Sequence, residues 1–262
     1  ETRESEIGTH LKLETENEIL TEKVSAPKGT CVSVKNISYN IPARRKFLKS
    51  DTTELKHIID EVERMAIPHI NIHFIVQSNG NEILNLPATT TIGRIKSLVG
   101  SYIQKELVPL AEDAQYIKIS GYVSLPQYCL KTKKEQFFFV NNRYVRNPFL
   151  NHAIYEAYKE LISFQSHPRY FIFLELDPAN IDINIHPTKT EVKFTDDKTA
   201  YLLLCSTIKR AIAKGAASDS LNFETETAFN TQTINASKNV TAPTININPS
   251  YNPFNNQHNF EQ

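Results

Sequence analysis

The sequence predicts an α+β fold, because two kinds of hydrophobic periodicity occur in separate stretches of it. Residues 181–186 alternate isoleucine with polar residues, which is the pattern of a strand with one buried face. Residues 55–65 place apolar side chains at helical spacing. Residues 170–176 are apolar on both faces, which predicts a strand in the middle of a sheet. The chain therefore combines strands with amphipathic helices.

The same patterns, together with turn and cap residues, predict the order of the elements. We expect strands over residues 8–13, 30–34, 70–76, 83–86, 116–123, 136–141, 170–176, 181–186 and 192–194. We expect helices over residues 51–65, 91–99, 147–161 and 197–215. An Asn-Gly pair at 79–80 predicts a hairpin, and residues 51–54 resemble a capping box in which Asp51 is the N-cap. An Asn-Pro pair at 147–148 predicts another helix start, and Asp197 is the expected cap of the last helix.

The composition limits the class of protein. With 262 residues, 40% of them hydrophobic, the chain can form one or two domains with a real core. Its formal net charge is zero, so any surface that binds nucleic acid or membrane must be local. The cysteines Cys31, Cys129 and Cys205 fit no CxxC pattern, which argues against a zinc site or a disulfide framework and favours a reducing cytoplasm.

The ends of the sequence suggest part of a longer protein. The chain begins at Glu1 and its only methionine is Met65, so we expect a fragment. No apolar run approaches the roughly 20 residues of a membrane span, and no signal peptide is apparent. Residues 216–262 are rich in Asn and Thr and lack a sustained hydrophobic period, which predicts a disordered linker.

Two basic segments are candidates for binding. Residues 29–49 join a Gly-Thr pair at the start of a strand to a Pro-Ala-Arg-Arg-Lys run, and an isolated run of this kind is usually a solvated loop. In residues 137–154, an apolar strand is followed by Asn-Asn and then by Arg143 and Arg146, which flank Tyr144. These arginines are either solvated hairpin residues or contacts to a nucleic-acid backbone, since a guanidinium offers phosphate a fixed fork of donors.

The third candidate segment is His-Pro-Thr-Lys at residues 186–189, between two strands. Pro187 stiffens the connection because its ring fixes φ. Lys189 is then either an ordinary surface lysine or a point charge held at a fixed place. Asp182 and Asp197 do not form a convincing acid–base pair, because one lies in a strand and the other at a helix cap. His69 and His73 have no carboxylate or cysteine near them in sequence, so no metal site is predicted.

These segments occur together, in this order, in the MutL family of DNA mismatch-repair proteins, which the chain resembles over residues 8–215. The matching sequences are GTCVSV, YNIPARRKFL, FFFVNNRYVRN, NHAI and LELDPANIDINIHPTKTEVKF. The resemblance implies a GHKL-type ATPase domain followed by a transducer domain with the ribosomal-protein-S5-domain-2-like fold. We accordingly expect residues 1–50 to be the end of the ATPase domain, residues 51–215 the transducer domain and residues 216–262 the linker.

The resemblance also implies roles for individual residues. Gly29 and Thr30 would lie on the strand that closes the adenine side of an ATP pocket. Lys189 would reach from the transducer domain to the terminal phosphate of ATP. Arg143 and Arg146 would belong to a basic surface that holds DNA. ATP and Mg²⁺ are thus the cofactors expected of the full-length protein.

The sequence also departs from the family pattern. The family's magnesium-binding Asn, water-activating Glu and adenine-reading Asp lie upstream, so we expect no catalytic residue in this fragment and no ATP hydrolysis by the fragment alone. The chain has VNNR where VNGR is common, and Asn142 can adopt the left-handed conformation almost as glycine does. It has HPTK where HPAK is common. The pair Asn147-Pro148 replaces more charged residues of some members, which predicts a weaker DNA surface.

The leading hypothesis is an ATP-gated, homodimeric matchmaker in DNA mismatch repair, located in the bacterial cytoplasm at the nucleoid. Its partners would be DNA, a mismatch-recognition protein and a downstream nuclease or helicase. The first alternative is a nucleic-acid-binding S5-like module without nucleotide gating. The second is the transducer domain of a type II topoisomerase, but those domains carry their lysine in a Gln-Thr-Lys sequence that this chain lacks.

Overall fold

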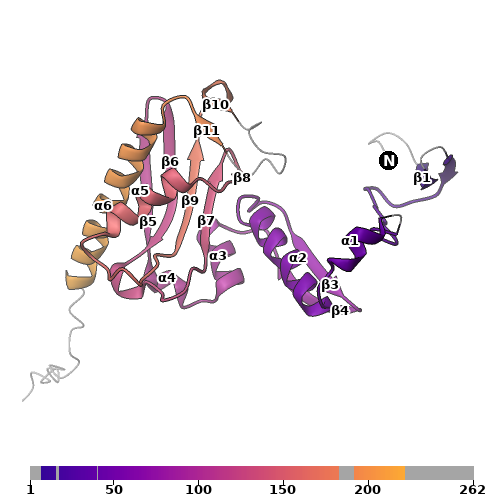
Figure 1. Cartoon of the computed structure of the whole chain (residues 1–262), viewed down its shortest axis with the longest axis horizontal. Coiled ribbons are helices and arrows are strands. Elements are labelled where there is room, and N and C mark those ends of the chain that lie inside the picture. Colours follow the sequence, from indigo (N-terminus) through magenta and orange to yellow (C-terminus); the bar gives the residue numbers. More distant parts are fainter. Residues whose placement is uncertain (1–6, 16–17, 40, 183–191, 222–262) are drawn as a thin grey trace, which may run out of the picture.

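The centre of the molecule is a five-stranded mixed sheet with the strand order β5-β6-β9-β7-β8. The computed structural model describes residues 7–15, 18–39, 41–182 and 192–221. The strands of this sheet are β5 (Leu107–Ala114), β6 (Ile117–Ser124), β7 (Gln136–Val140), β8 (Arg143–Tyr144) and β9 (Tyr170–Glu175). Strand β9 pairs antiparallel with β6 and parallel with β7, so it is central, as its two apolar faces predict (Figure 1).

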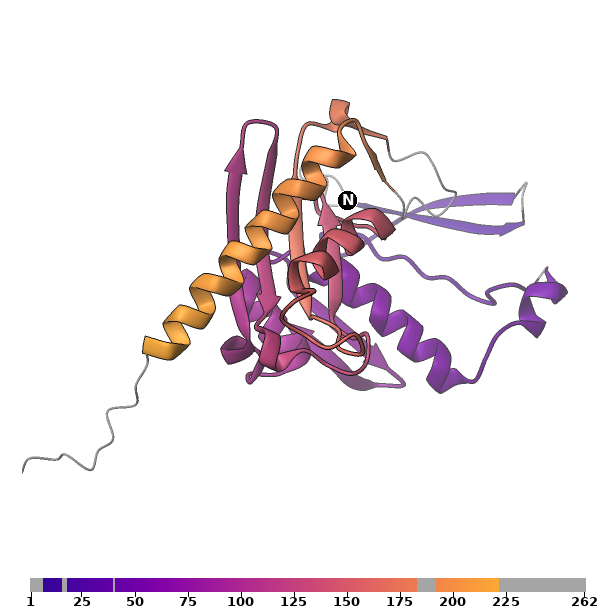
Figure 2. The same cartoon turned by 60° about the vertical axis from the view of Figure 1, so that its left-hand side comes forward.

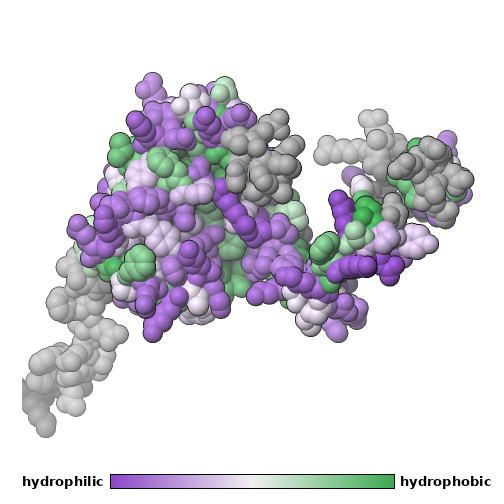
Figure 3. Space-filling model, in the orientation of Figure 1, coloured by the Kyte–Doolittle hydropathy of each residue, from purple (hydrophilic) through white to green (hydrophobic). Residues whose placement is uncertain are grey.

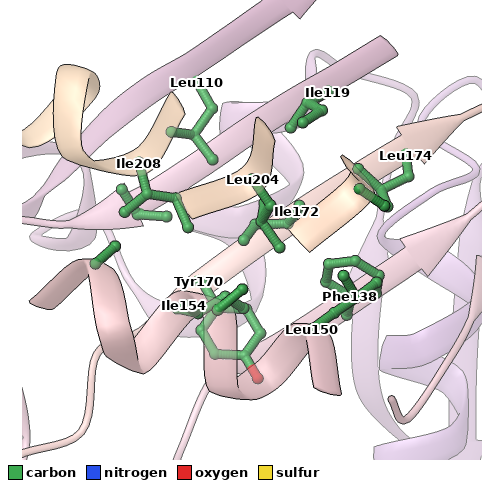
Figure 4. Packing of buried hydrophobic residues seen from close by; sticks show 14 of the residues in the cluster. Leu110, Ile119, Phe138, Leu150, Ile154, Tyr170, Ile172, Leu174, Leu204 and Ile208 are labelled. Carbon is green, nitrogen blue, oxygen red and sulfur yellow. The ribbon is translucent and has the colours of Figure 1, made fainter. Parts of the chain in front are cut away.

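Two long helices cover one face of the sheet. They are α5 (Pro148–Tyr158) and α6 (Asp197–Leu221), and Figure 2 shows α6 crossing the strands diagonally. The main core lies between these helices and the sheet. Figure 4 shows Leu150 and Ile154 of α5 and Leu204 and Ile208 of α6 against residues of β5, β6, β7 and β9. All four side chains are at most 1% exposed.

The opposite face of the sheet carries a ladder of stacked aromatic rings. Phe137 stacks on Phe171 with 5.4 Å between ring centroids, and Phe139 stacks on Phe173 at 5.0 Å. Tyr144 of β8 meets Phe137 and Phe139 edge-on, a favoured aromatic geometry. Helices α3 (Thr91–Val99) and α4 (Ile103–Glu106) contribute apolar side chains to this second cluster, and so does Ile67, which follows α2 (Asp51–Ala66).

A buried arginine organises the segment between α2 and the next hairpin. Arg94 of α3 is fully buried, and its guanidinium donates to the carbonyls of Leu86 (2.9 Å), Ile72 (2.7 Å) and Ile70 (3.2 Å). Burial lowers the pKa of Arg94. Because these bonds occupy the carbonyls of residues 70 and 72, the strand predicted over 70–76 begins only at Phe74.

Most predicted turns and helix starts are confirmed. Strands β3 (Phe74–Ser78) and β4 (Asn81–Leu86) form a hairpin in which Asn79 and Gly80 have φ values of 53° and 80°, as a type I′ turn requires. Asn147 caps α5 by accepting a hydrogen bond from the Leu150 amide.

Two helix caps differ from the prediction by one residue. Ser50, not Asp51, is the N-cap of α2, and the Glu54 carboxylate accepts from the Lys49 amide. At the start of α6 the carboxylate of Asp196 accepts from the Thr199 amide, while Asp197 accepts from Phe194. In both places two polar residues are adjacent, so the sequence alone does not fix which of them becomes the cap.

Helices α5 and α6 end at other residues than the sequence predicts. Helix α5 ends at Tyr158 and not at residue 161 as predicted, and Leu161 is 52% exposed. Helix α6 continues past Gly215 to Leu221. A Cβ atom at Gly215 would lie 2.3 Å from Cγ1 of Val108, so this glycine allows α6 to approach β5 closely and does not end the helix.

The sequence did not predict strand β5. Pro109 within this strand is compatible only with the edge position that β5 occupies.

The N-terminal region lies apart from this sheet (Figure 1). It comprises the hairpin of β1 (Gly8–Thr15) and β2 (Glu18–Val24) and the short helix α1 (Pro42–Lys46). The strand predicted over residues 30–34 is not formed, and Val32 and Val34 are 79% and 71% exposed. Among the described residues, no strand pairs with residues 30–34. Hydrophobic side chains therefore lie on the surface here (Figure 3).

None of the helices in the described ranges is both long and apolar enough to cross a membrane.

We predict that Gly121→Ala lowers the free energy of unfolding by about 2–5 kcal/mol, because it adds backbone strain to a steric clash. Gly121 lies on β6 with φ +130°, and a Cβ atom there would lie 2.0 Å from the Phe171 carbonyl oxygen of β9. Gly80→Ala is the matched control, since Gly80 also has positive φ but open space around it. Denaturant unfolding of both variants measures the difference, and an equal loss in both would contradict a steric role for Gly121.

Candidate functional site

The β7–β8 hairpin presents the two candidate DNA-binding arginines at the edge of the sheet. Its turn residues Asn141 and Asn142 both have positive φ, 47° and 63°, so Asn142 adopts the left-handed conformation that the sequence predicts for it. Arg143 follows on β8, which is an edge strand, and its side chain is exposed. Arg146 is also exposed, between β8 and the start of α5. Both arginines are thus exposed near the β8 edge of the sheet.

Tyr144 connects these arginines to helix α2. The guanidinium carbon of Arg64 lies 4.6 Å from the Tyr144 ring centroid, and that of Arg146 lies 6.0 Å from it, which are cation–π distances. The Arg146 side chain also donates to the Tyr144 hydroxyl at 3.4 Å. This hydrogen bond raises the pKa of Arg146, so its positive charge is retained. Arg64 forms an ion pair with Glu61, which leaves Arg143 and Arg146 as the better candidates for an external anion.

The strand pair that flanks the predicted lysine segment lies beside this hairpin at the end of the sheet (Figure 1). Strands β10 (Ile181–Asp182) and β11 (Lys193–Phe194) pair antiparallel, with Ile181 opposite Phe194, and we call this pair the stem. The Thr195 amide donates to the Asn180 carbonyl at 3.0 Å and extends the pairing by one bond. The stem confirms the start of the strand predicted over residues 181–186 and most of the strand predicted over residues 192–194. Lys189 itself, with the rest of 183–191, lies outside the described residues.

Two asparagines of the hairpin segment bind the chain on either side of the stem. The Asn141 side chain donates to the Leu176 carbonyl (2.9 Å) and accepts from the Leu176 amide (3.0 Å). The Asn147 side chain donates to the Val192 carbonyl (3.0 Å) while its oxygen caps α5. The sequence indicates only the helix cap for Asn147 and no role for Asn141, because both partners are more than 30 residues away in the chain.

Gly29 and Thr30 lie on the connection between β2 and α1, and both are exposed. Gly29 has φ +138°, a conformation that side chains rarely adopt. By themselves, these two residues do not enclose a nucleotide. The structure does not bring them together with Arg143 and Arg146, which belong to the five-stranded sheet (Figure 1).

A cavity of about 280 Å³ lies between β7, β8 and the first turns of α5. Its polar lining groups bond to one another or to nearby protein atoms: the Gln136 amide donates to Tyr155 and to the Pro168 carbonyl, and the Tyr170 hydroxyl donates to Asn151. Burial also raises the pKa of Tyr170. Because these lining groups already form hydrogen bonds within the protein, we assign the cavity a structural role.

The described part of the chain contains no group of three His, Cys, Asp or Glu residues that could hold a metal ion. Burial raises the thiol pKa of Cys129 and of Cys205, which makes both poor nucleophiles at neutral pH.

Comparison with known proteins identifies the family. Residues 95–213, which include the five-stranded sheet, match the family described as "DNA mismatch repair protein, C-terminal domain". The chain is 44% identical to the DNA mismatch repair protein MutL of Christiangramia forsetii over 98% of its own length, which is 42% of that protein. The chain belongs to the MutL family. The MutL of Flavobacterium psychrophilum is 41% identical over 96% of the chain and 41% of that protein.

Solved structures support the predicted fold class. An N-terminal domain of a DNA repair protein superimposes with a TM-score of 0.66 at 21% identity, covering 81% of this chain and 70% of that one. The Aquifex aeolicus MutL ATPase domain complexed with ADP gives a TM-score of 0.50 at 25% identity, covering 66% and 63%. The α+β fold expected of the end of a GHKL ATPase domain and an S5-like domain is therefore confirmed. The chain spans about two fifths of the length of the curated relatives that it matches.

We predict that Asn147→Ala destabilises this MutL chain by about 1 kcal/mol, because the first turn of α5 loses its cap. Asn147→Asp should lose much less, since a carboxylate can accept the same Leu150 amide and favours a helix N-terminus. Denaturant midpoints of the two variants test this, and equal destabilisation would show that the cap is not the source.

Proposed function

We propose that this chain is the part of a MutL mismatch-repair ATPase that senses bound ATP and contacts DNA. In the full-length protein, ATP would close a homodimer around DNA, and the closed dimer would recruit a mismatch-recognition protein and a downstream nuclease or helicase. Family membership supports this proposal together with one observation: the segment that carries Arg143 and Arg146 is hydrogen-bonded, through Asn141 and Asn147, to the residues Leu176 and Val192 that flank the stem.

The proposed task of Lys189 is to detect the terminal phosphate of ATP. A lysine and a phosphate about 4 Å apart at a partly screened site attract each other by roughly 4 kcal/mol before desolvation. A free energy of this size can favour the docked arrangement of two domains when the phosphate is present and release it when the phosphate is lost. The Lys189 side chain would act as a positive charge placed by the stem, and the residues that activate water would come from elsewhere in the longer protein.

Gly29 and Thr30 are the other proposed nucleotide contacts, on the adenine side of the pocket. Their exposure fits a site whose remaining residues belong to another part of the full-length protein. The same region carries exposed apolar side chains, including Val32, Val34 and Phe47, which more polypeptide would cover. ATP and Mg²⁺ are thus proposed for the longer protein, and an ADP complex of the Aquifex aeolicus MutL ATPase domain gives this proposal a precedent.

The proposed DNA contacts are Arg143 and Arg146. Both are exposed near one edge of the sheet, and both project from short segments that the aromatic ladder and α5 hold in place. Guanidinium groups at fixed positions suit the regularly spaced phosphates of a duplex. With a net charge of zero for the chain, the attraction is local, so we expect moderate affinity with strong salt dependence.

We predict that Lys189→Ala in the full-length protein reduces ATP turnover by about 100-fold, because the terminal phosphate loses a charge partner. ADP affinity and the thermal unfolding midpoint should stay unchanged, since ADP lacks that phosphate. Steady-state turnover and ADP titration are the measurements. Unaltered turnover would remove Lys189 from the site and favour an S5-like nucleic-acid-binding module without nucleotide gating.

We predict that replacing Arg143 and Arg146 together by Glu weakens DNA binding and flattens its salt dependence. If each arginine neutralises one phosphate, the slope of log K against log salt falls in magnitude by about 1.8 on duplex DNA. Glu replacement of Arg210, which pairs with Glu112, is the control for general charge change. A slope identical to that of the parent protein would exclude the two arginines from the DNA surface.

A further inference from the structure

Two loops meet at the end of the sheet where β7 and β9 begin. These strands run in parallel, so both start at the end opposite the turn of the β7–β8 hairpin. Residues 130–135 lead into β7, and residues 159–169 lead from α5 into β9. The two loops form a bridge, in which the Leu130 amide donates to the His167 carbonyl at 2.9 Å and the His167 amide donates to the Leu130 carbonyl at 2.7 Å.

The first loop presents three lysines. Lys131, Lys133 and Lys134 lie within four residues, and all three are exposed. None of them belongs to an ion pair among the described residues. The loop is held by the bridge at its start and, at its end, by the Tyr170 amide, which donates to the Glu135 carbonyl at 3.0 Å. Three positive charges thus lie on a short loop that is anchored at both ends.

The second loop presents a phenylalanine ring to solvent. Phe164 is 102% exposed, and Leu161 before it is 52% exposed. Phe164 lies in a tight turn, because the Ser166 amide donates to the Ser163 carbonyl at 2.9 Å. The hydroxyls of the same two serines are hydrogen-bonded to each other at 2.8 Å. The turn therefore fixes the backbone that carries the exposed ring.

The bridge brings the ring and the lysines together. Phe164 lies three residues before His167, and Lys131 directly follows Leu130. Three extended residues span at most about 11 Å, so the backbone of Phe164 lies within that distance of the bridge and that of Lys131 lies nearer. The two loops thus form one surface that combines an exposed aromatic ring with positive charge.

The chemistry of this surface matches a single-stranded nucleic acid. Every base has a flat face that stacks on an aromatic ring, and the phosphates between bases attract lysines. The exposed charged residues of the two loops favour a polyanion, since they are four lysines and one glutamate: Lys131, Lys133, Lys134, Lys159 and Glu160. Because the chain belongs to a family of DNA mismatch-repair proteins, the nucleic acid is DNA.

We propose that the two loops form a contact surface for single-stranded DNA. An unpaired base stacks on Phe164, while Lys131, Lys133 and Lys134 neutralise the phosphates beside it. In a duplex the bases are stacked within the double helix, so the ring selects unpaired DNA. The inference goes beyond the proposed function, because it uses neither Lys189 nor the two arginines of the hairpin segment.

The first test is Phe164→Ala in the full-length protein, with binding of a fluorescent oligothymidylate and of a DNA duplex followed by anisotropy. We expect the affinity for oligothymidylate to fall by about 5- to 100-fold, the range for loss of one stacked base. Duplex affinity should be unchanged. Phe164→Tyr is the matched control and should bind like the parent protein, because tyrosine keeps the ring. The thermal unfolding midpoint should not change, since the Phe164 ring is exposed.

The second test replaces Lys131, Lys133 and Lys134 together by Gln. For oligothymidylate, the slope of log K against log salt should fall in magnitude by about 2, because each phosphate neutralised on a single strand contributes about 0.7. Replacement of the same three residues by Arg is the control, which keeps the charge and should keep the slope. An unaltered slope in the Gln variant would contradict the role of the lysines.

Unchanged oligothymidylate affinity in Phe164→Ala would overturn the inference. An equal fall for oligothymidylate and duplex would also overturn it, because no base would then stack on the ring. Vesicles of anionic phospholipid test the other polyanionic surface. If the Phe164→Ala and lysine-to-Gln variants lose vesicle binding but keep their oligothymidylate affinity, the loops contact a membrane and the inference is wrong.

Glu replacement of Arg143 and Arg146, measured beside these variants, separates the inference from the proposed function. If that replacement leaves duplex binding unchanged while Phe164→Ala still weakens oligothymidylate binding, the arginine proposal fails and this inference stands. If it weakens duplex binding while Phe164→Ala has no effect on oligothymidylate, the inference fails and the arginine proposal stands.

Discussion

The pairing of β9 along both of its edges is the constraint on which the rest of the structure depends. Strand β9 is held antiparallel by β6 and parallel by β7, and its residues Phe171 and Ile172 are fully buried on opposite faces. One face supports the α5–α6 core and the other supports the aromatic ladder. Because β9 and β7 run in parallel, both strands finish at the same end of the sheet. That common end is where the β7–β8 hairpin meets the stem.

This arrangement places the β7–β8 hairpin beside the stem at one end of the sheet. The chain leaving β7 turns through Asn141 and carries Arg143, and the chain leaving β9 continues through Leu176 to the stem. The Asn141–Leu176 pairing is thus a direct connection between the segment proposed to contact DNA and the segment proposed to report bound ATP.

The elements that the sequence predicted correctly are those that carry strong local signals. Two apolar faces identified β9, an Asn-Gly pair identified the β3–β4 turn, and an Asn-Pro pair identified the start of α5. Edge strand β5 was missed because Pro109 interrupts its pattern. The segment over residues 30–34 has the composition of a strand but remains unpaired, since no strand partner lies within the described residues. Strand propensity alone does not supply the neighbour that a strand requires.

For the candidate site, the sequence identified the charged residues and missed the role of the neutral residues that bond the same segment to distant parts of the chain. Arg143 and Arg146 are recognisable because charge next to an aromatic residue is a local signal. The roles of Asn141 and Asn147 depend on contacts with residues far along the chain, so they emerge only from the fold.

Hydrogen exchange at the stem tests the central claim most directly, that the stem responds to the terminal phosphate of ATP. In the full-length protein, the Thr195 and Leu176 amides, bonded to Asn180 and Asn141, should exchange more slowly with a non-hydrolysable ATP analogue than with ADP. Equal exchange with both nucleotides would contradict the account.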